Sequence, residues 1–159
     1  MTGEWEQYRI DQAAAWLSKV RRVAGYADYM ESSADRQLEL ADNLRGIDYS
    51  AVRVSTSPTA DAIPDAVARH MELAEDFAAI ASAARELQSA AAHALSRLPD
   101  PTEAECLQRY YVDRAKTWEH VCVAMGYTYD GLMKLRRRAL LHAYDAMPHS
   151  ERDPIHPAL

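Results

Sequence analysis

Residues 117–144, TWEHVCVAMGYTYDGLMKLRRRALLHAY, contain the local signals that decide the fold. Thr117 can cap the N-terminus of a short helix that runs to Met125, and Thr128 can cap the helix that follows. Gly126 between them can adopt the positive φ that ends a helix. Two helices that are joined by so short a turn must cross steeply, so the stretch predicts a helix-turn-helix.

Apolar residues recur on one side of each predicted helix, which predicts that these two sides pack together. Cys122 is small and occupies the position where the two crossing helices come closest. The expected inner faces are formed by Trp118, Val121, Cys122 and Met125 in the first helix and by Leu132, Leu135, Ala139 and Leu140 in the second.

The opposite side of the second helix, predicted over 128–144, carries residues that are spaced three to four apart and therefore aligned. In a helix-turn-helix this side faces the base edges in the major groove of duplex DNA. Double-stranded DNA is therefore the expected partner. The expected base-reading residues on this side are Tyr129, Asp130, Met133, Lys134 and Arg137, and the expected phosphate contacts are Lys116, Arg136 and Arg138.

The composition predicts an all-α protein. The 159 residues include one Phe and five Gly among many Ala, Leu, Arg and Glu, and 48% are apolar and 26% charged, as in ordinary globular proteins. Two cysteines do not make a disulfide framework, so we expect a cytoplasmic location. The N-terminal region contains no uninterrupted apolar run, and we expect neither a signal peptide nor a membrane span.

The net charge of −6 is unevenly distributed along the chain. Residues 107–147 contain seven Lys or Arg and four Asp or Glu, a balance of +3, which leaves −9 for the rest of the chain. Such an asymmetry is expected when only one part of a protein meets phosphate groups.

Two long helices are predicted ahead of the helix-turn-helix. The first spans about 4–44, with a possible break at Glu31-Ser32-Ser33, and the second runs from Pro64 to Leu98. The Ser- and Thr-rich stretch between them predicts a loop over 46–63. Many apolar positions of the second helix are Ala at coiled-coil spacing, which contribute little buried area each, so we expect a hairpin that is completed by a second copy of the chain.

The predicted organisation has three parts. Residues 1–98 form a helical hairpin and oligomerisation region, 99–147 a three-helix DNA-binding domain, and 148–159 a Pro-rich disordered tail. In the DNA-binding domain, Thr102 and Glu105 are expected to form a capping box that opens a helix ending near Ala115.

These motifs resemble region 4 of sigma-70-family factors. The matching residues are Arg109-Tyr110-Tyr111, Thr117-Trp118-Glu119 and Gly126-Tyr127-Thr128, and the connector Tyr49 to Pro58 is similar to that of phage and prophage late-gene regulators of the ArpU and RinA type. The resemblance implies a phage-derived transcriptional regulator, adds Thr128 to the base-reading set, and makes RNA polymerase a possible further partner. Gly131 and Met133 depart from the sigma pattern, and the segment that binds the −10 element is absent.

Other classes of function fit the sequence less well. No metalloprotease pair or phosphate-binding loop is present, so neither an enzyme nor a cofactor is expected. A metal site of Cys106, Cys122 and His120 is disfavoured because the spacing lacks a CxxC pair. A small terminase subunit is the main alternative, although its DNA-binding unit normally precedes its hairpin. A coiled-coil interaction protein that does not bind DNA is the other.

Overall fold

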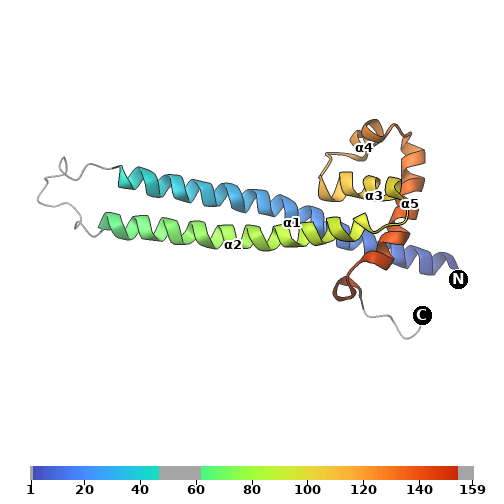
Figure 1. The fold of residues 1–159 in the computed structure, drawn as a ribbon, viewed down its shortest axis with the longest axis horizontal. Coiled ribbons are helices and arrows are strands. Elements are labelled where there is room, and N and C mark those ends of the chain that lie inside the picture. Colours follow the sequence, from blue (N-terminus) through green and yellow to red (C-terminus); the bar gives the residue numbers. More distant parts are fainter. Residues whose placement is uncertain (1, 47–61, 154–159) are drawn as a thin grey trace, which may run out of the picture. The chain divides into compact units, whose positions relative to one another are not determined.

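The computed structural model describes residues 2–46 and 62–153, and these residues form helices and no strand, which confirms the all-α prediction. α1 (Thr2–Arg45) and α2 (Ala62–Ser96) form an antiparallel hairpin (Figure 1). They are followed by α3 (Pro101–Leu107), η2 (Gln108–Val112), α4 (Trp118–Met125), α5 (Tyr129–Ala146) and η3 (His149–Glu151). Most of the predicted 46–63 loop lies outside the described residues. No described helix is long and apolar enough to cross a membrane.

α1 differs from the prediction because it is unbroken at Glu31-Ser32-Ser33. The Ser33 side chain is buried within the helix pair, so packing outweighs the weak helix preference of serine. α2 begins at Ala62, two residues before the predicted start at Pro64.

The chain divides into two compact units. One unit comprises Met1–Ala24 with Glu86–Leu159, and the other is Gly25–Arg85. The first part of α1 and the last part of α2 share one apolar core with the C-terminal helices. This core includes Ile10, Trp16, Leu17, Val20, Leu95, Leu107, Tyr111, Leu140 and Tyr144. We call the first unit the helix-turn-helix unit and the second the hairpin unit.

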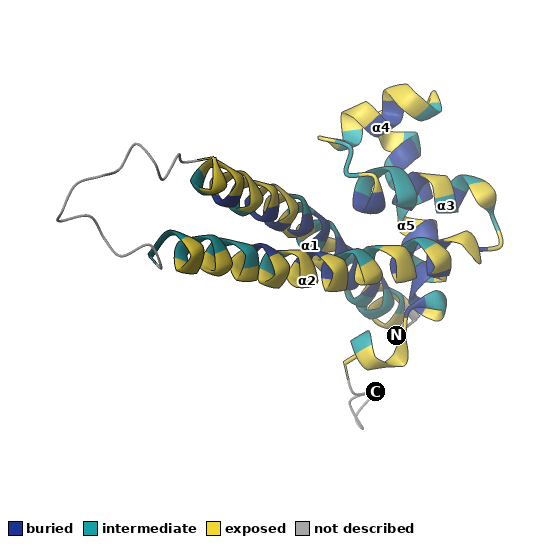
Figure 2. Ribbon diagram, turned by 60° about the vertical axis from the view of Figure 1, so that its left-hand side comes forward, coloured by how far each residue is buried: buried dark blue, intermediate teal, exposed yellow. Residues whose placement is uncertain are grey.

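The hairpin unit is held by a narrow seam of small residues. The facing sides of α1 and α2 are buried and their outer sides exposed (Figure 2). In the seam His70 Nδ1 lies 2.6 Å from Gln37 Oε1. Along one side Arg85 pairs with Asp28 and Glu31, and the hydrogen bond from Arg85 lowers the pKa of Glu31. The buried seam residues are mostly alanines: Ala27, Met30, Ser33, Ala34, Ala41, Ala74, Ala81 and Ala84.

The helix that leads into the helix-turn-helix is capped and shaped differently from the prediction. Asp100, not Thr102, is the N-cap of α3, and its carboxylate accepts a hydrogen bond from the Thr102 backbone N–H. After Leu107 the chain continues as the π-helical turn η2. Glu105 pairs with Arg109 at 2.8 Å and so does not close a capping box.

Candidate nucleic-acid interface

The turn between α4 and α5 has the local structure that the sequence predicts. Gly126 has φ 73° and ends α4. The hydroxyl oxygens of Thr117 and Thr128 accept hydrogen bonds from the backbone N–H groups of His120 and Gly131, which caps the two helices. Three residues, 126–128, therefore separate α4 from α5, as in a helix-turn-helix.

The inner faces of α4 and of the first part of α5 pack together as predicted, whereas Ala139 and Leu140 belong to the core that α5 shares with α1 and α2. Val121, Cys122, Leu132 and Leu135 form a buried cluster with Cys106 of α3. Burial raises the pKa of the Cys106 thiol to about 12, so the group stays neutral inside the cluster. Both cysteines are free, and the described residues contain no group of three or more side chains that could hold a metal ion. His120 instead lies 2.6 Å from Thr117 Oγ1.

Gly131 occupies a position with little room for a side chain. A Cβ atom at this position would lie 3.0 Å from Thr128 Oγ1 and 3.6 Å from Tyr127 Cδ1. The cap of α5 thus leaves little room for a side chain three residues into the helix, although glycine costs about 1 kcal/mol of helix propensity relative to alanine.

Most of the predicted base-reading residues lie on the exposed side of α5. Thr128, Tyr129, Asp130 and Lys134 are exposed, with half of the Tyr129 surface accessible. Met133 is only partly exposed because it packs against the cluster under the turn. The outward surface is thus concentrated in the first two turns of α5.

Arg137 is exposed but has partners within the protein. Its guanidinium donates a hydrogen bond to Gln7 Oε1 at 3.2 Å and lies 3.8 Å from Glu6 Oε2. Both partners belong to the first turns of α1. The sequence contained no signal for this contact, since the residues are 130 positions apart.

The three predicted phosphate contacts separate into two kinds. Lys116 and Arg138 are exposed and make no side-chain hydrogen bond or ion pair within residues 2–46 and 62–153. Arg136 differs from the prediction because its side chain turns inward. It donates to the Tyr111 hydroxyl at 3.3 Å and lies 5.1 Å from the centre of the Trp118 ring, with Nε buried.

Arg136 is the end of a stack that fixes the helix-turn-helix onto α1. Its guanidinium covers Trp118, which stacks on Tyr110 at 3.9 Å, and the other face of Tyr110 is approached by Arg21 at 4.2 Å. Arg21 also donates to the Tyr110 carbonyl at 2.5 Å. Cation–π contacts of this kind hold aromatic rings in a defined position. The stack joins α1, η2, α4 and α5, so it orients the exposed side of α5.

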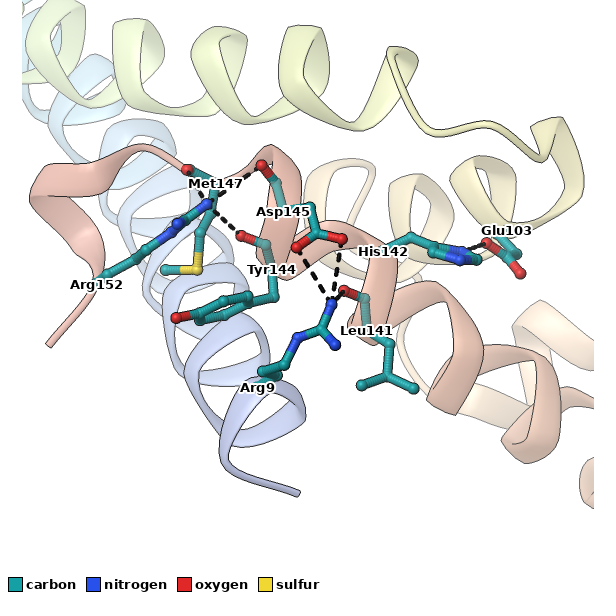
Figure 3. Close-up of polar contacts among 8 residues, drawn as sticks. All are labelled: Arg9, Glu103, Leu141, His142, Tyr144, Asp145, Met147 and Arg152. Atoms are coloured by element: carbon teal, nitrogen blue, oxygen red, sulfur yellow. Dashed lines mark hydrogen bonds and ion pairs between the residues drawn. The ribbon is translucent and has the colours of Figure 1, made fainter. Parts of the chain in front are cut away.

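The C-terminal half of α5 is fixed by a polar network (Figure 3). Arg9 of α1 pairs with Asp145 at 3.2 Å, and the buried Glu103 accepts a hydrogen bond from His142 at 2.5 Å. Arg152 donates to the carbonyls of Tyr144 and Met147, which the end of α5 leaves unpaired. The first part of the predicted disordered tail, residues 148–153, is thus docked, while 154–159 lie outside the described residues.

Sequence reasoning missed two exposed apolar side chains beside this surface. Val123 on α4 is 85% exposed and Tyr127 in the turn is 38% exposed. Val123 falls outside the inner face of α4, so its position on the helix was a usable signal. Arg114, just ahead of α4, has a left-handed backbone with φ 60°, which no local pattern indicated.

The exposed side of α5 is the candidate nucleic-acid interface, and the exposed Lys116 ahead of α4 and Arg138 on α5 are the candidate phosphate contacts. No protein-family model, curated protein or solved structure matches this chain.

Proposed function

We propose that this chain is a sequence-specific DNA-binding transcriptional regulator of phage or prophage origin that acts as a homodimer or higher homo-oligomer. The observation that supports the proposal is the capped turn at Gly126, ahead of a helix whose first two turns expose polar side chains. A helix of this kind fits the major groove with its N-terminal residues against the base edges. No catalytic role is assigned to any residue.

Lys134 is the best candidate for a base contact. It is exposed and makes no hydrogen bond or ion pair with any described residue, so its ammonium group is available to guanine O6 and N7. Tyr129 and Asp130 lie on the same side, one turn nearer the N-terminus. The exposed Lys116 and Arg138 are the candidates for phosphate contacts, which set affinity and register.

The test begins with selection of bound duplexes from a random library, followed by titration of the selected duplex and a scrambled one. Lys134→Ala should weaken the selected duplex by about 1–3 kcal/mol more than the scrambled one, because base contacts discriminate between sequences. Lys116→Ala and Arg138→Ala should weaken both duplexes equally and should each reduce the slope of log K against log salt by roughly one unit.

Arg22→Ala is the matched control, since Arg22 is exposed on α1 and makes no ion pair with a described residue. It removes the same charge away from α5 and should leave both titrations unchanged. If no duplex is selected at low salt, or if Lys134→Ala and Arg22→Ala behave alike, the coiled-coil interaction protein becomes the better account.

A further inference from the structure

The hairpin unit has two long sides of opposite character. One side is marked by contacts between the helices: Arg85 with Asp28 and Glu31, and Arg45 with the Met71 sulfur at 2.7 Å. Glu31 and Arg45 are two heptads apart on α1, and Met71 and Arg85 are two heptads apart on α2. These contacts therefore follow a single polar edge along the hairpin.

The other side carries apolar residues that nothing covers within the described chain. Tyr26 and Leu40 on α1 are 50% and 40% exposed, and Leu73 and Ile80 on α2 are each 42% exposed. Each of the four directly precedes a buried alanine of the seam. In an antiparallel helix pair, the residues that directly precede seam residues on the two helices lie on the same side of the pair. We call these four residues the apolar face. Among the other large apolar residues, Leu38 is 45% exposed but shares the heptad position of Glu31 and lies on the polar edge.

The hairpin unit buries little apolar surface without a further layer. Both apolar core clusters of the described residues belong to the helix-turn-helix unit. The hairpin seam consists mainly of alanines, which contribute little hydrophobic free energy. A helix pair with one apolar side exposed is stabilised when a second layer packs on it.

We propose that the apolar face is the interface with a second copy of this chain, in a four-helix arrangement whose two-fold axis runs parallel to the hairpin. This inference rests on the homo-oligomer in the proposed function and identifies the surface through which the copies associate. A two-fold interface requires a surface that is complementary to itself.

The charges that border the apolar face meet this requirement. Arg36 on α1 and Asp76 on α2 each lie two residues after a seam alanine, and both are exposed without an ion pair to a described residue. Gln37 contacts His70 and Glu31 contacts Arg85. Arg36 lies between the two α1 members of these pairs and Asp76 between the two α2 members, so both lie at about the same height along the hairpin. In the proposed arrangement each Arg36 faces an Asp76 of the other copy, which makes two equivalent ion pairs.

The shape of the surface agrees with this register. A shallow hollow of about 290 Å³ beside Leu73 is lined by Arg69, Glu72, Leu73 and Asp76. Leu40 lies on α1 between Gln37 and Arg45, whose partners on α2 are His70 and Met71. It is therefore at about the height of this hollow, and in the proposed arrangement Leu40 of one copy faces the hollow of the other. The parallel axis also brings together the Gly25/Arg85 ends of the two hairpins, from which both chains continue into their helix-turn-helix units.

The experiment measures the mass of the full chain by light scattering and sedimentation without DNA, so its outcome is independent of DNA binding. The unmodified chain should be a dimer. Leu73→Ser should raise the dimer dissociation constant at least about tenfold, because each dimer loses two buried leucines. Leu38→Ser is the matched control, since Leu38 is similarly exposed but lies on the polar edge, and it should leave the constant unchanged. A monomer throughout the range of about 1–100 µM would overturn the inference.

If circular dichroism shows that Leu73→Ser loses helical structure, a set of charge-reversal variants tests the interface instead. Arg36→Glu and Asp76→Arg should each weaken the dimer, and the double variant should restore it because the two charges then pair in the opposite sense. Equal weakening by Leu38→Ser and Leu73→Ser, or a double variant no stronger than the single ones, contradicts the apolar face as the interface.

Discussion

Arg136 shows how one side chain of a basic run can be structural while its neighbours stay exposed. It contacts the Tyr111 hydroxyl and the Trp118 ring from inside the helix-turn-helix unit. Arg136→Ala should therefore lower the free energy of unfolding by about 2 kcal/mol, from the lost charged hydrogen bond and cation–π contact. Urea unfolding followed by circular dichroism measures this change. Arg138→Ala, two residues along the same helix, is the control and should shift the free energy by less than about 0.5 kcal/mol. Equal effects of the two substitutions would mean that Arg136 does not hold the unit together.

At the scale of elements, η3 and the residues around it complete α5. Arg152 donates to the carbonyls of Tyr144, Asp145 and Met147, and its guanidinium lies 4.6 Å from the centre of the Tyr144 ring. Arg152→Ala should lower the melting temperature by several degrees, because the last carbonyls of α5 lose their donor at a partly buried site. Differential scanning calorimetry provides the measurement. Lys19→Ala is the control, since it breaks only the exposed pair with Glu151 and should cost at most about 1 kcal/mol. An unchanged melting temperature for Arg152→Ala would show that η3 is not needed by α5.

At the scale of the whole molecule, the two units should differ in local stability. The helix-turn-helix unit contains both apolar clusters, whereas the hairpin unit is held by a seam of alanines. Backbone amides of residues 25–45 and 62–85 should therefore exchange with deuterium faster than those of α5 in dilute protein, and their exchange should slow as the concentration rises and dimers form. Hydrogen exchange with mass spectrometry at two protein concentrations measures both effects. The amides of α5 are the internal control, since their exchange should depend little on concentration. Slower exchange in the hairpin than in α5 at the lower concentration would contradict the assignment of the weaker unit.

The sequence predicted those features that depend on neighbouring residues. The capping of α4 by Thr117, the left-handed Gly126 and the capping of α5 by Thr128 are each decided within a few positions of the chain. The spacing of apolar residues in α4 and α5 is also a local pattern, and it predicted the buried cluster between these two helices. Local capping and periodicity were therefore enough to locate the candidate interface.

The tertiary structure decided features that depend on residues far apart in the chain. The inward turn of Arg136, the pairing of Arg137 with Glu6 and the docking of Arg152 all follow from where distant helices pack, and no short pattern encodes them. The composition of the units has the same origin, because apolar residues of the first part of α1 share a core with the C-terminal helices. The sequence by itself determined where helices start, stop and turn, since those preferences are local. Which charged side chains remain free for a ligand was decided only by tertiary packing, because a partner such as Asp145 for Arg9 lies 136 residues away.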